Sequence, residues 1–121
     1  MATPDVRAYL YDVAEACRLL MRFTQGKGLA DYRDDPLLQS AVERQFEIVG
    51  EALGQALQTD PGLAGSITGA RRIVAFRNRL IHGYRVVSHE MVWSILQVNL
   101  PVLAREVAGL LVEGEKDAAP G

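Results

Sequence analysis

The chain has 121 residues, of which 49% are hydrophobic and 23% are charged, and its formal net charge is −2. This composition predicts one folded domain with its own core and argues against global disorder. A slightly acidic chain is not a general nucleic-acid coat protein, although a local basic cleft can still attract anions. The single cysteine, Cys17, cannot form an internal disulfide, which fits a reducing cytoplasm. Its position in an apolar helical stripe predicts core packing rather than a reactive thiol.

No stretch of the sequence approaches the ~18 consecutive apolar residues that a membrane span needs. The N-terminus lacks the apolar run of a signal peptide. We therefore expect a cytoplasmic protein that does not associate with membranes.

The N-terminal half predicts two long helices. Thr3-Pro4-Asp5 is a typical helix start, with a capping residue, a proline in the first turn and an acid near the positive end of the helix dipole. Apolar residues then recur at helical spacing until Gly26 and Gly28 end the helix. Asp34-Asp35-Pro36 opens the second helix, which contains Gly50 and Gly54. We expect these glycines to allow close approach of another helix, with interruption of the helix as the alternative.

The C-terminal half predicts two more helices after a turn at Asp60-Pro61-Gly62. The third helix is predicted from about Ile67 to about His82, with Gly83 placed to end or bend it. The fourth begins at Ser88-His89-Glu90, and Pro101 should kink it because proline removes one backbone donor.

The predicted fold is therefore all-α, an up-and-down bundle of four main helices. A single helical domain is expected over residues 1–112. The polar segment 113–121 is expected to be a flexible, disordered tail.

The segment Arg77-Asn78-Arg79-Leu80-Ile81-His82-Gly83-Tyr84 is the strongest functional signal. It lies in a window, residues 61–89, that contains five arginines and no aspartate or glutamate. The other eight basic residues and all 15 acidic residues lie outside that window. An acidic chain thus carries a local positive charge around its Arg-His motif.

Helical geometry constrains how these side chains can cooperate. At ~100° per residue, Arg77 and Tyr84 share one stripe, and Asn78 and His82 share a neighbouring one. Roughly 140° separates Arg77 from His82, so a straight helix does not direct both at one ligand. Either the backbone bends near Gly83 or a second copy of the chain completes the site, as a two-fold dimer would allow.

These residue types suit RNA cleavage without a metal. The attacking 2′-hydroxyl needs a base and the leaving 5′-oxygen needs an acid, and His82 titrates near neutrality and can serve as either. The Arg77 guanidinium can stabilise charge on the phosphoryl oxygens with paired hydrogen bonds. Two histidines and one cysteine make no plausible zinc site, so we predict no metal and no cofactor.

Each residue also has a structural interpretation. His82 can simply favour the C-terminal end of the helix dipole. Arg77 and Arg79 can be solvated charges or ion-pair partners of Glu47 and Glu51, which line one helix face together with Glu43. For this acidic row, a solvated or ion-paired face is more plausible than a metal cluster. Trp93 is expected in the core, and His89 is assigned no function.

Three segments together resemble the HepT-like toxins of the HEPN superfamily. They are Val42 to Ala52, Phe76 to Tyr84, and Val92-Trp93 through Asn99-Leu100-Pro101. The family hallmark is an arginine, four residues, a histidine, one residue and a tyrosine, often with asparagine after the arginine. Arg77, Asn78, His82 and Tyr84 fill those positions, while Gly83 stands where many relatives carry an aspartate.

The resemblance implies an all-helical homodimer with the Arg-His motifs near its interface. It implies a metal-independent endoribonuclease in which Arg77 and His82 are catalytic and Asn78 and Arg79 support RNA binding. Such toxins are usually paired with a minimal nucleotidyltransferase antitoxin, which in the best-understood pairs transfers AMP to the motif tyrosine, here Tyr84. A bulky anion there would fill the cleft and repel RNA. The alternative is a non-catalytic helical partner that positions a substrate for the nucleotidyltransferase.

Overall fold

The computed structural model describes residues 4–83 and 87–118, and every regular element within those ranges is helical. The elements in chain order are α1 (Pro4–Thr24), α2 (Leu29–Arg33), α3 (Pro36–Thr59), the 3₁₀ turn η1 (Pro61–Gly65), α4 (Ala70–His82), α5 (His89–Ser94), the π-helical segment η3 (Ile95–Asn99) and α6 (Leu100–Ala118). The predicted all-α bundle with four main helical segments is confirmed.

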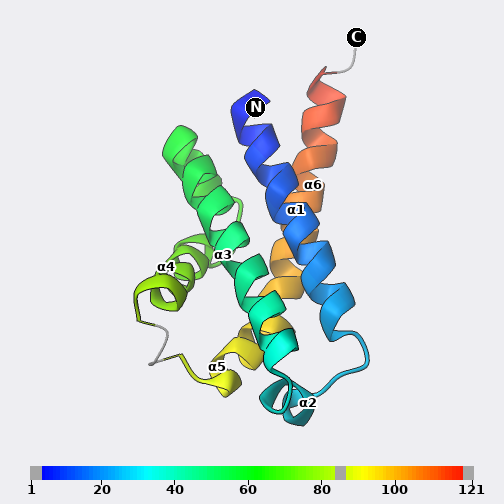
Figure 1. Ribbon diagram of the computed structural model, residues 1–121. Coiled ribbons are helices and arrows are strands. Elements are labelled where there is room, and N and C mark those ends of the chain that lie inside the picture. Colours follow the sequence, from blue (N-terminus) through cyan, green and yellow to red (C-terminus); the bar gives the residue numbers. More distant parts are fainter. Residues whose placement is uncertain (1–3, 84–86, 119–121) are drawn as a thin grey trace.

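Helix α1 occupies the middle of the bundle and packs against both α3 and α6, while α4 packs against the outer side of α3 (Figure 1). The apolar stripes of these helices meet in one core. Its largest fully buried side chains are Tyr32, Leu10, Leu20, Leu53, Ile67 and Leu103. Cys17 is buried in this core, and burial raises the pKa of its thiol to about 12, so the predicted packing role is confirmed.

The starts of α3 and α5 follow the predicted capping chemistry. The Asp35 carboxylate accepts a hydrogen bond from the Leu38 N–H at the start of α3. The Ser88 hydroxyl accepts one from the Met91 N–H at the start of α5. Each bond satisfies a backbone donor that the first turn of a helix leaves without a partner.

Several helix boundaries differ from the prediction. The five-residue helix α2 was not predicted, because so short a segment carries no readable periodicity. Helix α4 begins at Ala70 rather than near Ile67, because Gly69 has a left-handed φ of 67° that no helix interior adopts. Helix α6 continues through Ala118, into the segment predicted to be a polar tail.

Pro101 is accommodated by a change of helical type. The Leu100 N–H donates to the Ile95 carbonyl, five residues back, in the π-helical segment just before the proline. Such π turns are a recognised site of helix bending, and the chain changes direction between α5 and α6 (Figure 1). The predicted disturbance is therefore present, one turn earlier than the proline itself.

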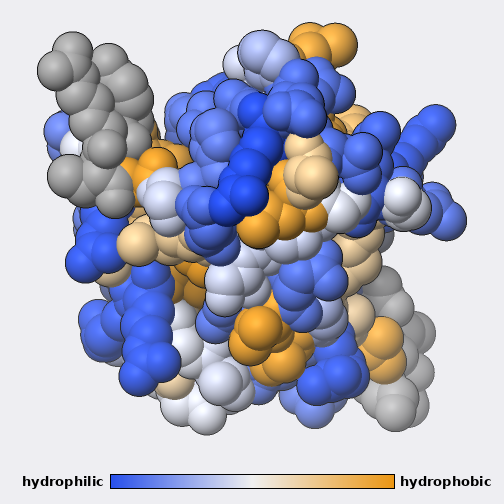
Figure 2. All heavy atoms as spheres, turned by 90° about the horizontal axis from the view of Figure 1, so that it is seen from below, coloured by the Kyte–Doolittle hydropathy of each residue, from blue (hydrophilic) through white to orange (hydrophobic). Residues whose placement is uncertain are grey.

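The helical stretch His89–Gly114 bears on the expectation that the protein does not associate with membranes. By length and composition alone it could cross a membrane, with a mean hydropathy of 1.5 over an 18-residue window. One such helix is weak evidence for a membrane span, since the mostly buried core helix of a soluble protein passes the same test. Here 22% of that window is buried, and Val92, Leu96, Leu103 and Val107 of this helix belong to the core. At the end of the molecule formed by α2 and α5, apolar side chains lie in separate clusters among polar ones (Figure 2).

Candidate active site

Helix α4 carries the motif and exposes most of its charge. Its apolar positions Ile73, Phe76 and Leu80 are buried, and Phe76 packs edge-on against Phe46 of α3 at a ring-centroid distance of 5.2 Å. The helix ends at His82, and Gly83 caps it with its N–H donated to the Arg79 carbonyl at 2.8 Å. Gly83 thus ends the helix as predicted, with an ordinary negative φ of −142°.

The stem of Arg77 lies directly against Gly50 of α3. A β-carbon built on Gly50 would overlap the Cβ and Cγ atoms of Arg77. Because those atoms are close to the α4 backbone, they cannot swing aside as the tip of a long side chain could. The predicted close approach is therefore confirmed at Gly50, and α3 continues without interruption.

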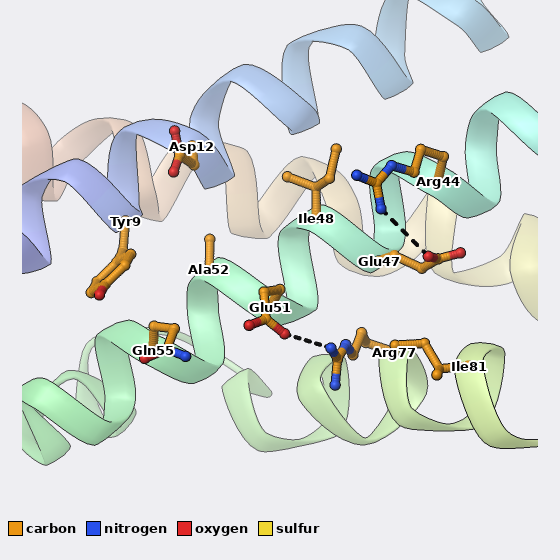
Figure 3. A pocket seen from close by; sticks show the side chains of 10 residues that line it. All are labelled: Tyr9, Asp12, Arg44, Glu47, Ile48, Glu51, Ala52, Gln55, Arg77 and Ile81. Carbon is orange, nitrogen blue, oxygen red and sulfur yellow. Dashed lines mark hydrogen bonds and ion pairs between the residues drawn. The ribbon is translucent and has the colours of Figure 1, made fainter.

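The Arg77 guanidinium is held in place by two partners. Its Nη2 donates to Glu51 Oε2 at 2.5 Å (Figure 3). Its Nη1 donates to Asn78 Oδ1 at 3.0 Å. Its Nε is buried without a hydrogen-bond partner in the described part of the chain. Only 25% of the Arg77 side chain is exposed, against 56% of Glu51. The predicted ion pair with Glu51 is therefore confirmed for Arg77. The guanidinium has five N–H donors, so some of them stay available to a ligand.

Arg77 borders a groove of about 670 Å³ between α1, α3 and α4, which we call the Arg77 groove (Figure 3). It is lined by Tyr9, Asp12, Arg44, Glu47, Ile48, Glu51, Ala52, Gln55, Arg77 and Ile81. Three carboxylates face two guanidinium groups there, and Glu47 pairs with Arg44 at 3.7 Å. The acidic helix row is thus ion-paired at Glu47 and Glu51, as expected.

Glu43 begins the same row but lies in different surroundings. Burial first, and repulsion from Glu47 second, raise the pKa of the Glu43 carboxyl, while His89 opposes this. The His89 ring packs edge-on against buried Tyr32, whose hydroxyl has no partner among the described residues. Trp93 is only partly buried and packs against the same ring at 5.6 Å between centroids. Within the described ranges, no cluster of three or more potential metal ligands is present.

The other predicted site residues lie on the exposed side of α4. Asn78, Arg79 and His82 are all exposed. The structure brings Asn78 to Arg77, whereas no hydrogen bond joins Arg77 to His82 within the described residues. Tyr84, the predicted modification site, lies outside the described residues. One chain therefore presents Arg77 and His82 on different sides of the helix.

A second groove on α4 was missed at the sequence level. It is lined in part by Arg71 and Asn78, which are seven residues apart and share one helical stripe. The spacing of Arg71 and Asn78 was readable from the sequence. The groove itself was not, because it depends on how α3 and α4 are rotated against each other.

The fold and the motif together define a helical bundle with an Arg-Asn-x₃-His sequence at the end of one short helix. A family model described as Ribonuclease HepT-like matches residues 13–110. The chain therefore belongs to the HepT-like ribonuclease family, which confirms the resemblance.

Curated relatives agree with this assignment. The chain is 31% identical over 111 residues to a "Putative RNase" of Caldanaerobacter subterraneus subsp. tengcongensis, covering 92% of this chain and 96% of that protein. It is 34% identical over 95 residues to the "Probable ribonuclease HepT" of Thermococcus cleftensis, covering 78% and 86%. A "Putative RNase" of Methanocaldococcus jannaschii is 29% identical over 107 residues, covering 88% and 97%. No solved structure matches the chain at a significant level.

Proposed function

We propose that this protein is a metal-independent endoribonuclease that acts as a toxin, with Arg77 and His82 as its catalytic residues. Asn78 orients Arg77, and Arg79 adds positive charge for RNA. The observation that supports this most is the combination on α4 of a buried-stem arginine with an exposed histidine at the helix end. Membership in a family described as ribonucleases supports the same substrate class.

The chemistry requires a base, an acid and a cation that stabilises the phosphoryl oxygens. The ribose 2′-oxygen attacks the adjacent phosphorus while its proton passes to a ring nitrogen of His82. The bond from phosphorus to the 5′-oxygen breaks, that oxygen takes a proton from a second acid, and a cyclic phosphate remains on the other product. Arg77 stabilises the charge that builds on the phosphoryl oxygens, using N–H donors that Glu51 and Asn78 leave free.

A homodimer supplies the missing second acid in this proposal. Each chain has one His82, and it does not meet Arg77 across the straight helix α4. A two-fold interface beside α4 would place two copies of His82 and Arg77 around one RNA strand. One imidazole then acts as base and the other as acid.

Control of the toxin falls to Tyr84 and a partner protein. We propose that a minimal nucleotidyltransferase antitoxin transfers AMP to Tyr84, two residues from His82, and that the added anion blocks RNA binding. The proposed compartment is the cytoplasm, where the free thiol of Cys17 stays reduced.

The direct test is to induce wild type and His82→Ala separately in bacteria and follow growth together with total RNA. Wild type should arrest growth and produce new RNA fragments. His82→Ala should lose about 10²–10⁴-fold in cleavage rate, the usual contribution of an acid-base group. Purified wild type should cleave RNA in EDTA, and a 2′-deoxyribose at the cleavage site should stop the reaction.

His89→Ala is the matched control, because His89 is the only other histidine of the chain and lies on α5 against Tyr32. It should retain cleavage if its circular dichroism spectrum is that of wild type. Well-folded wild type that neither arrests growth nor cleaves RNA would instead support the non-catalytic partner of a nucleotidyltransferase.

A further inference from the structure

A second groove lies between α3 and α4, away from the Arg77 groove. It has a volume of about 350 Å³, and its polar lining comes from Gln58 of α3 and from Arg71 and Asn78 of α4. Gly54 of α3 also lines it. We call it the Arg71 groove. It shares Asn78 with the motif, so it adjoins the proposed catalytic residues directly.

The two grooves differ in charge, and the difference decides which one suits a polyanion. The Arg77 groove contains three carboxylates and two guanidinium groups. The Arg71 groove contains one guanidinium group and no carboxylate. Although the Arg77 groove is larger and includes the proposed catalytic arginine, its carboxylates outnumber its guanidinium groups, so its lining attracts an RNA backbone less than the lining of the Arg71 groove does.

Arg71 also differs from Arg77 in what it contacts. Arg77 is paired with Glu51. Arg71 is exposed, and within the described part of the chain its guanidinium takes part in no ion pair or hydrogen bond that would compete with a ligand. A phosphate binding there displaces only water.

Helical periodicity connects this groove to the proposed catalytic histidine. Arg71, Asn78 and His82 fall within about 40° of one another around α4, at ~100° per residue. The eleven residue-to-residue steps from Arg71 to His82 extend ~16 Å along the helix axis, a length that a few nucleotides span. One exposed stripe of α4 thus leads from the histidine past Asn78 to the groove.

We propose that the Arg71 groove is an RNA-backbone subsite, in which Arg71 binds a phosphate a few nucleotides away from the bond that His82 cleaves. The inference rests on the proposed ribonuclease function and names how that function holds its substrate. Gln58 and Asn78 supply neutral hydrogen bonds to phosphate or ribose, and none of these contacts reads a base edge. The subsite therefore favours longer RNA strands without selecting a sequence.

The test compares Arg71→Ala with Arg72→Ala. Arg72 is the matched control because it follows Arg71 on the same helix, carries the same charge, is also exposed and lines a different surface with Ile73 and Phe76. Fluorescence anisotropy would measure binding of labelled 2′-O-methyl oligouridylates, which resist cleavage. Lengths of about 4 and about 16 nucleotides bracket common single-strand site sizes.

For the longer strand, Arg71→Ala should weaken binding about three- to tenfold and lower the slope of log affinity against log salt by about 0.7, the loss expected for one phosphate contact. Arg72→Ala should change neither, and Arg71→Lys should restore the salt slope because it keeps the charge. The difference in RNA affinity between Arg71→Ala and Arg72→Ala should be smaller for the shorter strand.

Equal effects of Arg71→Ala and Arg72→Ala at both lengths would overturn the subsite. If wild type cleaves RNA in a His82-dependent way under that outcome, the ribonuclease proposal stands and only the subsite fails. If wild type neither binds nor cleaves any strand, the ribonuclease proposal itself fails.

Discussion

Gly50 and Gly54 lie one turn apart on the same face of α3, yet they meet α4 in different ways. At Gly50 a β-carbon would overlap the stem of Arg77. At Gly54 the nearest atom to such a β-carbon would be Cγ1 of Val74, at an ordinary 3.8 Å. The first glycine is required for contact between the helices, whereas the second leaves room.

The contacts at Gly50 and at Gly54 therefore have different structural roles in the α3–α4 pair. The tight crossing at Gly50 fixes the root of Arg77, so that its guanidinium can only turn about its distal bonds toward Glu51 and Asn78. The looser contact at Gly54 opens the Arg71 groove. Two glycines on one face of α3 therefore have different consequences. Gly50 fixes the position of Arg77, and Gly54 leaves the Arg71 groove open.

Gly50→Ala should have the largest effect on stability. Because the new methyl group meets atoms next to the α4 backbone, the helices must move apart, and overpacking of this kind costs about 1–3 kcal/mol. Urea denaturation at one fixed protein concentration would measure the loss, since the stability of the proposed dimer would depend on concentration. RNA cleavage should fall with it because Arg77 is displaced.

Gly109→Ala is the control for that substitution, because Gly109 lies within α6 and nothing lies within 4 Å of a β-carbon there. Alanine at an open helical site should be neutral or stabilising. If Gly50→Ala were as well tolerated as Gly109→Ala, the crossing would not be tight and Arg77 would not be fixed by it.

Glu51→Ala should have the next largest effect, mainly on catalysis. Losing one hydrogen bond that orients Arg77 should lower kcat about fivefold, or ~1 kcal/mol, with little change in KM. Stability should change by less than ~1 kcal/mol, since the pair is partly solvent-exposed. Glu51→Gln keeps an acceptor oxygen and should recover part of the rate.

Glu47→Ala provides the comparison for Glu51, because Glu47 lies one turn earlier on α3 and pairs with Arg44 instead of Arg77. It should leave kcat near the wild-type value. Equal losses of kcat in both variants would mean that the acidic row acts through its general charge and that Glu51 does not position Arg77.

Local signals in the sequence predicted much of this arrangement. Capping at Asp35 and Ser88, the glycines of α3 and the motif on α4 were all readable, because each depends on a few neighbouring residues. Glu51 was foreseen as one possible partner of Arg77. The rotation of α3 against α4 was not readable, and so the choice between Glu47 and Glu51 and the existence of the Arg71 groove required coordinates.

Gly54→Ala should have the smallest effect, and its sign distinguishes the two glycines. The added methyl group makes an ordinary contact with Val74, so α3 should gain about 0.5–1 kcal/mol because glycine is a poor residue for a helix interior. The same methyl group enters the Arg71 groove, which Gly54 lines, and should weaken binding of a long RNA strand by no more than about threefold.

Stability and binding should therefore change in opposite directions at Gly54, whereas both should fall at Gly50. This pattern is hard to produce by general loosening of the bundle, which would lower both quantities at either site. Measuring urea denaturation and RNA anisotropy on the same preparations of Gly50→Ala and Gly54→Ala distinguishes these site-specific effects from general loosening. If Gly54→Ala lost as much stability as Gly50→Ala, α4 would lie equally close to both glycines, and the groove would be too shallow to hold a phosphate.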